Sequence, residues 1–214
     1  MKDLVIIGAG GFGRETLALV EEINEATPTW NFVGFIDDGE LGVLPEGYST
    51  LGGLEYLKNM NPKPYAVISI ASAAVRERIA GICEKAGIPF ATLIHPSVKM
   101  KGSLCTVGEG SILCDGVKLA VNSHVGKHCI MNMSCGLGHD TIMDDYSSMM
   151  SETITGGDTY IGKRCYFGLR CTVINQLKIT DDCTFGAGAV VVKNAEVAGT
   201  YVGVPAKMIK PLQR

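Results

Sequence analysis

The sequence carries an apolar residue at every sixth position from Val107 to Val197, and this feature constrains the fold more than any other. Only Thr155 breaks the series, although just 46% of the whole chain is hydrophobic. Such a short period is typical of stacked short strands, because each repeat buries its apolar residue against identical neighbours. The pattern therefore predicts a narrow parallel β-helix over the second half of the chain.

A second series of small residues follows the apolar series at a distance of four positions. Its members are Ser111, Val117, Ser123, Cys129, Cys135, Thr141, Ser147, Thr153, Thr159, Cys165, Cys171, Leu177, Cys183, Ala189, Ala195 and Tyr201. We expect one large and one small side chain of each repeat to point inward. Six of the eight cysteines share the small phase, and a free cysteine packs as a small apolar residue. Because no C-x2-C pair occurs, we interpret them as core residues rather than as zinc ligands or disulfides.

Glycine often comes directly after the apolar position of the repeat. The cases are Gly108, Gly126, Gly138, Gly156, Gly162, Gly168 and Gly186. A tight corner there would need φ values that other residues resist. We therefore expect the corners of the β-helix at these glycines.

The first hundred residues alternate strand-like and helix-like patterns. We expect strands within residues 4–13, 32–38, 65–71 and 90–96, and helices over 14–24 and 74–87. This alternation predicts a small parallel sheet in a Rossmann-like α/β domain. The Pro/Gly-rich residues 39–64 are expected to form a surface connection. We place the domains at 1–94 and 95–214.

Gly8, Gly10 and Gly13 form a G-x-G-x-x-G pattern between the first strand and the first helix. In this context backbone amides and the helix N-terminus hold a diphosphate. Asp37 or Asp38, at the end of the second strand, can accept hydrogen bonds from a ribose or a base. A sheet of about four strands lacks the second half that a dinucleotide needs, so a mononucleotide or a nucleotide sugar fits better. The alternative is that the glycines only permit tight packing of helix on strand.

Charge and hydropathy exclude two classes of partner. The net charge of -3 and the pI near 5.8 offer no basic face for nucleic acid. No apolar run reaches the roughly 20 residues that span a bilayer. The early glycines do not fit a signal peptide, so we expect a cytoplasmic protein.

The six-residue series, "GHD" at 138–140 and the ending "VVVKNAEVAGTYVGVPAKMIK" resemble the left-handed parallel β-helix acyltransferases. With "GAGGFGRE", "FIDD" and "SIASAAVRERI", the chain is similar to the nucleotide-amino-sugar N-acetyltransferases and sialic acid O-acetyltransferases. This resemblance implies a left-handed coil with three faces and 18 residues per turn. It also implies a homotrimer that binds acetyl-CoA between neighbouring helices.

The resemblance makes His139 the general base, and a neutral imidazole is suited to that role. His139 is out of phase with both inward series, so we expect it to point outward. Asp140 would be its partner, although adjacent strand residues normally point to opposite sides, and a corner would remove the conflict. Asn132 is the next candidate if Asp140 turns away. The simpler alternative is that His139 is only a surface residue.

The resemblance also implies residues that bind the two substrates. The backbone N–H of Gly157 would face the developing oxyanion, and Lys193 and Lys207 would meet the CoA phosphates. The alternatives are a plain corner glycine and solvated lysines. Phe12 stands where many relatives have histidine, so it would stack or pack apolarly. The residues implied for the nucleotide sugar are Gly8, Gly10, Gly11, Gly13, Arg14, Asp37, Asp38 and Ala71.

A metal site is not expected. His124, His128 and His139 together would resemble the zinc site of the gamma-class carbonic anhydrases, which share this helix. Their spacings of 4 and 11 residues place them on three different faces.

We therefore expect an acetyl-CoA-dependent N-acetyltransferase for a nucleotide-linked amino sugar, such as UDP-4-amino-4,6-dideoxy-N-acetylglucosamine. The alternative within the class is a sialic acid O-acetyltransferase. An alternative of another class is a non-catalytic trimeric scaffold that senses a nucleotide sugar.

Overall fold

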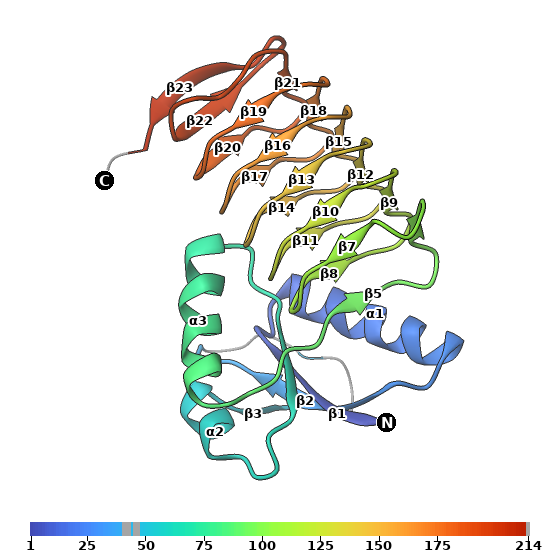
Figure 1. Ribbon diagram of the computed structural model, residues 1–214. Coiled ribbons are helices and arrows are strands. Elements are labelled where there is room, and N and C mark those ends of the chain that lie inside the picture. Colours follow the sequence, from blue (N-terminus) through green and yellow to red (C-terminus); the bar gives the residue numbers. More distant parts are fainter. Residues whose placement is uncertain (40–43, 45–47, 213–214) are drawn as a thin grey trace. The chain divides into compact units, whose positions relative to one another are not determined.

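The computed structural model describes residues 1–39, 44 and 48–212, and the chain divides into two compact units, Met1–Pro96 and Ser97–Arg214 (Figure 1). Our sequence-based boundary after residue 94 lies close to this division. None of the helices in the described ranges is long and apolar enough to cross a membrane.

The first unit contains a parallel sheet with the order β3-β2-β1-β4. Its strands are β1 (Lys2–Ile7), β2 (Trp30–Ile36), β3 (Thr50–Gly52) and β4 (Tyr65–Ile68), with the short β5 (Leu93–Ile94) later in the unit, and its helices are α1 (Gly11–Ala26), α2 (Leu54–Asn59) and α3 (Ala73–Lys85). The central strand β1 is apolar and fully buried from Leu4 to Ile6, as a strand covered on both sides requires. The predicted Rossmann-like sheet is confirmed.

The fourth strand of this sheet is not the one we predicted. Residues 90–96 contribute β5 and a single bridge between Ala66 and Phe90. The strand β3 comes instead from residues 39–64, which also carry α2, so the prediction of a plain connection there was wrong. Three residues are too few to show an alternating pattern. Residues 40–43 and 45–47 of that segment lie outside the described residues.

The second unit is a stack of short parallel strands in three sheets. Within this unit the sheet orders are β19-β16-β13-β10-β7, β23-β22-β20-β17-β14-β11-β8 and β21-β18-β15-β12-β9-β6. The strands of the first are β7 (Thr106–Val107), β10 (His124–Val125), β13 (Ile142–Met143), β16 (Tyr160–Ile161) and β19 (Lys178–Ile179). Those of the second are β8 (Ile112–Leu113), β11 (Ile130–Met131), β14 (Ser148–Met149), β17 (Tyr166–Phe167), β20 (Cys183–Phe185), β22 (Gly199–Val202) and β23 (Lys207–Pro211). Those of the third are β6 (Lys99–Met100), β9 (Lys118–Leu119), β12 (Gly136–Leu137), β15 (Ile154–Thr155), β18 (Thr172–Val173) and β21 (Val190–Val191).

Paired residues in neighbouring coils are 18 positions apart, as His124 and Ile142 are. Three strands therefore make one coil, and the stack is visible as successive rungs in Figure 1. The predicted parallel β-helix is confirmed.

The apolar series fills the interior of the coil. Leu113, Met131 and Phe167 have no exposed surface, and the rings of Phe167 and Phe185, one coil apart, stack at 4.9 Å between centroids. The last member, Val197, is 54% exposed, so the inward series ends before it. The chain leaves the six-residue period there and forms the antiparallel pair of β22 and β23.

The small inward series is held by a repeated hydrogen bond across the coil. The hydroxyl of Ser111 donates to the Gly126 carbonyl, fifteen residues on, at 2.8 Å. The thiol of Cys129 makes the equivalent bond to the Asp144 carbonyl at 3.2 Å. Serine, threonine and cysteine are interchangeable here because each offers a small side chain with a donor. The bond satisfies a carbonyl that would otherwise be buried without a partner.

The corners of the coil lie two residues later than predicted. The left-handed φ values fall three positions after the apolar residue, for example 58° at Asn122 and 55° at Asp140. The glycines directly after the apolar position do not have positive φ, so our reason for them was wrong. They are needed for space, because a Cβ on Gly126 would lie 2.7 Å from the Asp145 nitrogen of the next coil.

The steric requirement predicts different costs for two glycine substitutions. Gly126→Ala should destabilise the protein by about 1–3 kcal/mol, the usual cost of overpacking. Gly136→Ala is the matched control, because its Cβ would have no neighbour closer than 3.8 Å. Urea unfolding of both variants measures the difference. Equal unfolding midpoints for the two variants would refute the steric explanation.

The buried thiols should be unreactive in the folded protein. Burial raises the pKa of Cys135 and of Cys171 to about 12, so little reactive thiolate is present at pH 8. Cys105 and Cys114 are only half-buried and should react first with an aromatic disulfide reagent. The remaining six should react only when denaturant is added. Rapid reaction of all eight in the native protein would contradict the assigned core.

Candidate active site

His139 lies two residues after the end of β12 and points away from the coil, with its side chain 66% exposed. Its Nδ1 is 2.8 Å from Oδ2 of Asp140. Adjacent residues can meet in this way because Asp140 occupies a left-handed corner, with φ of 55°. The corner removes the conflict between neighbouring strand residues that the sequence raised.

The environment of Asp140 favours its ionised form. The Asn122 side-chain amide donates to Oδ1 of Asp140 at 2.8 Å, and this bond, followed by the bond to His139, lowers the pKa of the Asp140 carboxyl. An ionised carboxylate only accepts, so the proton of a neutral imidazole lies on Nδ1 of His139. Its Nε2 is then left with an open lone pair.

Gly157 lies beside that open nitrogen. A Cβ on Gly157 would be 2.5 Å from Nε2 of His139, so the missing side chain makes room for the imidazole. The next residue, Asp158, donates its N–H to the His139 carbonyl at 2.7 Å and fixes the two coils in register. The Gly157 N–H itself meets no acceptor within the described ranges. A base nitrogen and a backbone donor are thus neighbours.

Asn132 does not lie beside His139 within one subunit. It follows β11, which belongs to a different sheet from β12, and its side-chain oxygen accepts the N–H of Met133 at 2.6 Å. Because Asp140 faces His139, the condition under which we named Asn132 is not met. Asn122 is the residue that the sequence reasoning missed. Its signal was available, since it precedes Asp140 by one 18-residue coil.

The other two histidines of the β-helix have separate surroundings. His128 is buried and its ring stacks on Tyr146 at 5.2 Å. His124 lies within hydrogen-bond distance of Thr106 and Asn122. In the described part of the chain, no three His, Cys, Asp or Glu side chains are grouped to hold a metal ion.

Lys193 and Lys207 are exposed near the C-terminal end of the β-helix. Lys193 follows β21, and Lys207 begins β23. Their predicted role toward the CoA phosphates stays a prediction.

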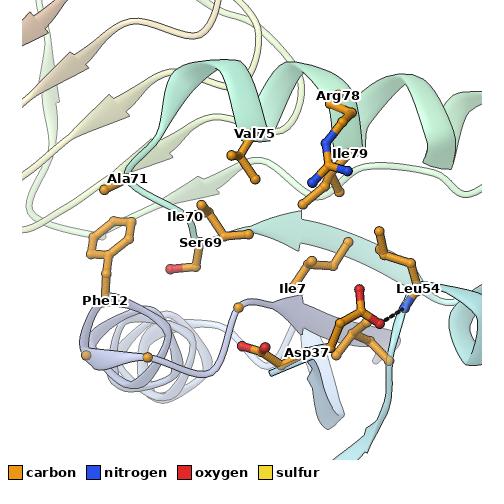
Figure 2. Close-up of a pocket in the computed structure, with 15 residues that line it drawn as sticks. Ile7, Phe12, Asp37, Leu54, Ser69, Ile70, Ala71, Val75, Arg78 and Ile79 are labelled. Atoms are coloured by element: carbon orange, nitrogen blue, oxygen red, sulfur yellow. Dashed lines mark hydrogen bonds between the residues drawn. The ribbon is translucent and has the colours of Figure 1, made fainter. Parts of the chain in front are cut away.

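The first unit contains a cavity of about 430 Å³ beside the glycine loop (Figure 2). Six predicted residues line it, namely Gly8, Gly10, Gly11, Asp37, Asp38 and Ala71. Gly13 and Arg14 are not among the lining residues. A Cβ on Gly13 would lie 2.1 Å from the Gly8 carbonyl oxygen, so Gly13 serves close packing of helix on strand. The alternative explanation of the motif therefore holds for this glycine.

The N-terminus of α1 lies at this cavity, because Gly10 and Gly11 line it. Gly10, at the N-cap, is extended and provides no side-chain cap, and no acidic residue lies in the first turn. The first N–H groups of a helix have no intrahelical acceptor, and the helix dipole makes this end positive. An anion is the natural partner for such an end. The phenyl ring of Phe12 lines the same cavity.

The two aspartates differ in what they already bind. The carboxylate of Asp37 accepts the N–H of Ala9 and the N–H of Gly39, both at 2.9 Å, and so braces the glycine loop. Asp38 accepts the N–H of Leu54 through Oδ1 at 3.2 Å. Among the described residues, Oδ2 of Asp38 has no donor. Asp38 is therefore the aspartate with an oxygen available to a ligand.

Two arginines of α3 complete the site, and neither was predicted. Arg78 lines the cavity, and Figure 2 shows its side chain extending from α3 toward the strands. Arg76 is fully buried and donates from Nη1 to the carbonyls of Ile70 and Ala71, at 2.8 and 2.9 Å. These two bonds hold the segment of Ile70 and Ala71, which lines the cavity. The three-residue spacing of Val75 and Arg78 on one helical face could have located Arg78.

Comparison with known proteins agrees with this arrangement. Residues 3–82 match the family model described as the PglD N-terminal domain. The GDP-perosamine N-acetyltransferase of Escherichia coli O157:H7 is 28% identical over 164 residues, which are 76% of this chain and 74% of the relative. The residues matched by the family model include the glycine loop.

Two solved structures share the fold over nearly the whole chain. A variant of perosamine N-acetyltransferase from Caulobacter crescentus, in complex with CoA and GDP-perosamine, has a TM-score of 0.87 at 23% identity and covers 98% of this chain and 97% of its own. The acetyltransferase domain of PglB from Neisseria gonorrhoeae FA1090, in complex with acetyl coenzyme A, has a TM-score of 0.85 at 25% identity, covering 97% and 99%.

The chain thus shares its two-unit architecture, a Rossmann-like unit and a parallel β-helix, with these acetyltransferases. The resemblance to nucleotide-amino-sugar N-acetyltransferases that we drew from the sequence is confirmed, and the similar structures contain CoA or acetyl coenzyme A.

The contact between Gly157 and His139 predicts the effect of a single methyl group. Gly157→Ala should displace the imidazole, because the new Cβ would meet the flexible side chain of His139 rather than backbone. Stability should change little, by less than about 1 kcal/mol, since the ring is free to rotate into solvent. Thermal unfolding together with a crystal structure of the variant tests this. A ring that keeps its bond to Asp140 would contradict the prediction.

Proposed function

We propose that the chain is an acetyl-CoA-dependent N-acetyltransferase for a nucleotide-linked amino sugar of the 4-amino-4,6-dideoxy type. One observation carries the proposal: an ionised Asp140 holds Nδ1 of the outward-facing His139, while Nε2 lies open beside Gly157. The relative that acts on GDP-perosamine supports an amino sugar on a nucleotide as the acceptor.

In this reaction the sugar amine attacks the thioester carbonyl carbon. A C–N bond forms and the C–S bond breaks. Nε2 of His139 takes the proton that the amine loses and returns a proton to the departing thiolate. General-base catalysis of this kind gives about 10²- to 10⁴-fold. The Gly157 N–H donates to the carbonyl oxygen as negative charge grows on it.

The cavity of the first unit binds the nucleotide part of the acceptor. Backbone amides of the glycine loop and the N-terminus of α1 hold the diphosphate, and Arg78 adds positive charge. Asp38 accepts hydrogen bonds from the ribose or the base through its open oxygen. Phe12 packs against the ligand apolarly, where a histidine would have made a polar contact.

A homotrimer would complete the site. His139 is open to solvent, and an acyl transfer is protected when water is excluded. Ile142 and Ile154, on the coils around His139, are exposed by 43% and 52%, and such apolar surface favours cover by another subunit. We place the pantetheine of CoA in that interface, with Lys193 and Lys207 toward its phosphates.

The cytoplasm is the proposed place of action. All eight cysteines are free thiols, and six of them are buried in the core. Free thiols persist in a reducing compartment such as the cytoplasm.

Thiol release from acetyl-CoA tests the function. The purified protein is offered UDP-, dTDP- and GDP-linked 4-amino-4,6-dideoxy sugars, CMP-sialic acid and free sialic acid. We expect release with a nucleotide amino sugar, and His139→Ala should lower kcat by at least about 100-fold. Leu169→Ala is the matched control, because Leu169 is exposed at the same position of another repeat.

Other outcomes identify the alternatives. Release only with a sialic acid indicates O-acetylation. Tight nucleotide-sugar binding without release from any acceptor indicates a scaffold. Near-normal turnover of His139→Ala removes the histidine from the mechanism.

A further inference from the structure

A continuous series of polar contacts leads away from His139 across the corner of the coil. Beyond Asp140, it passes to Asn122 at 2.8 Å, from Oδ1 of Asn122 to Nε2 of His124 at 3.2 Å, and from Nδ1 of His124 to the Thr106 hydroxyl at 2.9 Å. These residues come from three successive coils. Of this series, the resemblance to known acetyltransferases assigned a role only to His139 and Asp140.

The donors and acceptors in this series have one consistent arrangement. An ionised Asp140 only accepts, so Asn122 must present its NH₂ group to it. The amide oxygen of Asn122 then faces His124, and Nε2 of His124 must donate to it. A neutral His124 therefore accepts the Thr106 hydroxyl proton at Nδ1. His124 thus fixes which way the Asn122 amide points.

The backbone places Asn122 where it can act. Asn122 and Asp140 occupy the same corner position in successive coils, with φ of 58° and 55°. Asparagine and aspartate enter this left-handed region more readily than most residues. The N–H of Asp140 also donates to the Val121 carbonyl at 3.0 Å, so the two corners stack in register.

We propose that Asn122, oriented by His124, is a positioning residue for acetyl transfer. It holds the Asp140 carboxylate against Nδ1 of His139, and Nε2 stays open to take the proton of the acceptor. The inference rests on the proposed function, because it concerns the same base.

An amide is suited to this task for two reasons. It donates a hydrogen bond without a positive charge, so it leaves the charge of Asp140 directed at the imidazole. A lysine or arginine in its place would compete with His139 for the carboxylate. An amide also does not titrate, so it takes no proton from the pair.

Two substitutions of Asn122 separate positioning from folding. Asn122→Gly removes the side chain and accepts positive φ, as Gly110 and Gly116 do at the equivalent position of earlier repeats. It should lower kcat about tenfold while KM for acetyl-CoA and for the nucleotide sugar stays within about twofold. Asn122→Asp has nearly the same shape, but it sets a second carboxylate against Asp140 and should lower kcat further.

The tautomer of His139 gives a readout that does not depend on turnover. Long-range ¹H–¹⁵N spectra of histidine-labelled protein identify the protonated ring nitrogen, and His139→Ala assigns the signal. Wild type should carry the proton on Nδ1. Asn122→Gly should show a mixture of tautomers, and His124→Ala a smaller shift in the same direction.

Glu152→Gly is the matched control. Glu152 has φ of 62° at an equivalent corner, and its carboxylate contacts Arg170 at 2.6 Å on another face. Its kcat and the His139 spectrum should match wild type. An unchanged tautomer and kcat in Asn122→Gly, with His139→Ala inactive, would overturn this inference alone. Full activity of His139→Ala would overturn the proposed function instead.

Discussion

The structure depends on a left-handed turn of the backbone once in every six residues of the β-helix. Each turn brings the chain onto the next face, and the 18-residue coil places corner residues of neighbouring coils on top of one another. The site follows from this constraint. The corner at Asp140 turns its carboxylate back onto His139, and the corner one coil earlier supplies Asn122.

The β-helix could be predicted from the sequence because nearly every six-residue repeat carries the same apolar position. The phase also predicted that His139 points outward. The corner was misplaced because glycine is the usual sign of a positive φ, whereas here residues such as Asn122 and Asp140 adopt it. The resemblance implies 18 residues per coil, and the residue 18 positions before Asp140 is Asn122. The partner of Asp140 was therefore predictable from the sequence.

The first unit was less predictable because its cavity is assembled from segments far apart in the chain. The glycine loop was evident from its motif, yet the motif did not separate Gly10, which lines the cavity, from Gly13, which serves packing. Nor did "FIDD" reveal that both oxygens of Asp37 accept backbone N–H groups, whereas Asp38 accepts one through Oδ1 only. Hydrogen bonds of this kind depend on tertiary contacts that a local pattern does not encode.

The donor bonds of the small inward residues have a consequence for how such a chain can vary. A thiol at Cys129 and a hydroxyl at Ser111 both reach the carbonyl fifteen residues ahead. Exchange between sulfur and oxygen at these positions keeps the bond between coils, while it alters the vulnerability of the core to oxidants. Descendants exposed to oxidative surroundings therefore have an open mutational route, from cysteine to serine or threonine, that leaves the architecture intact.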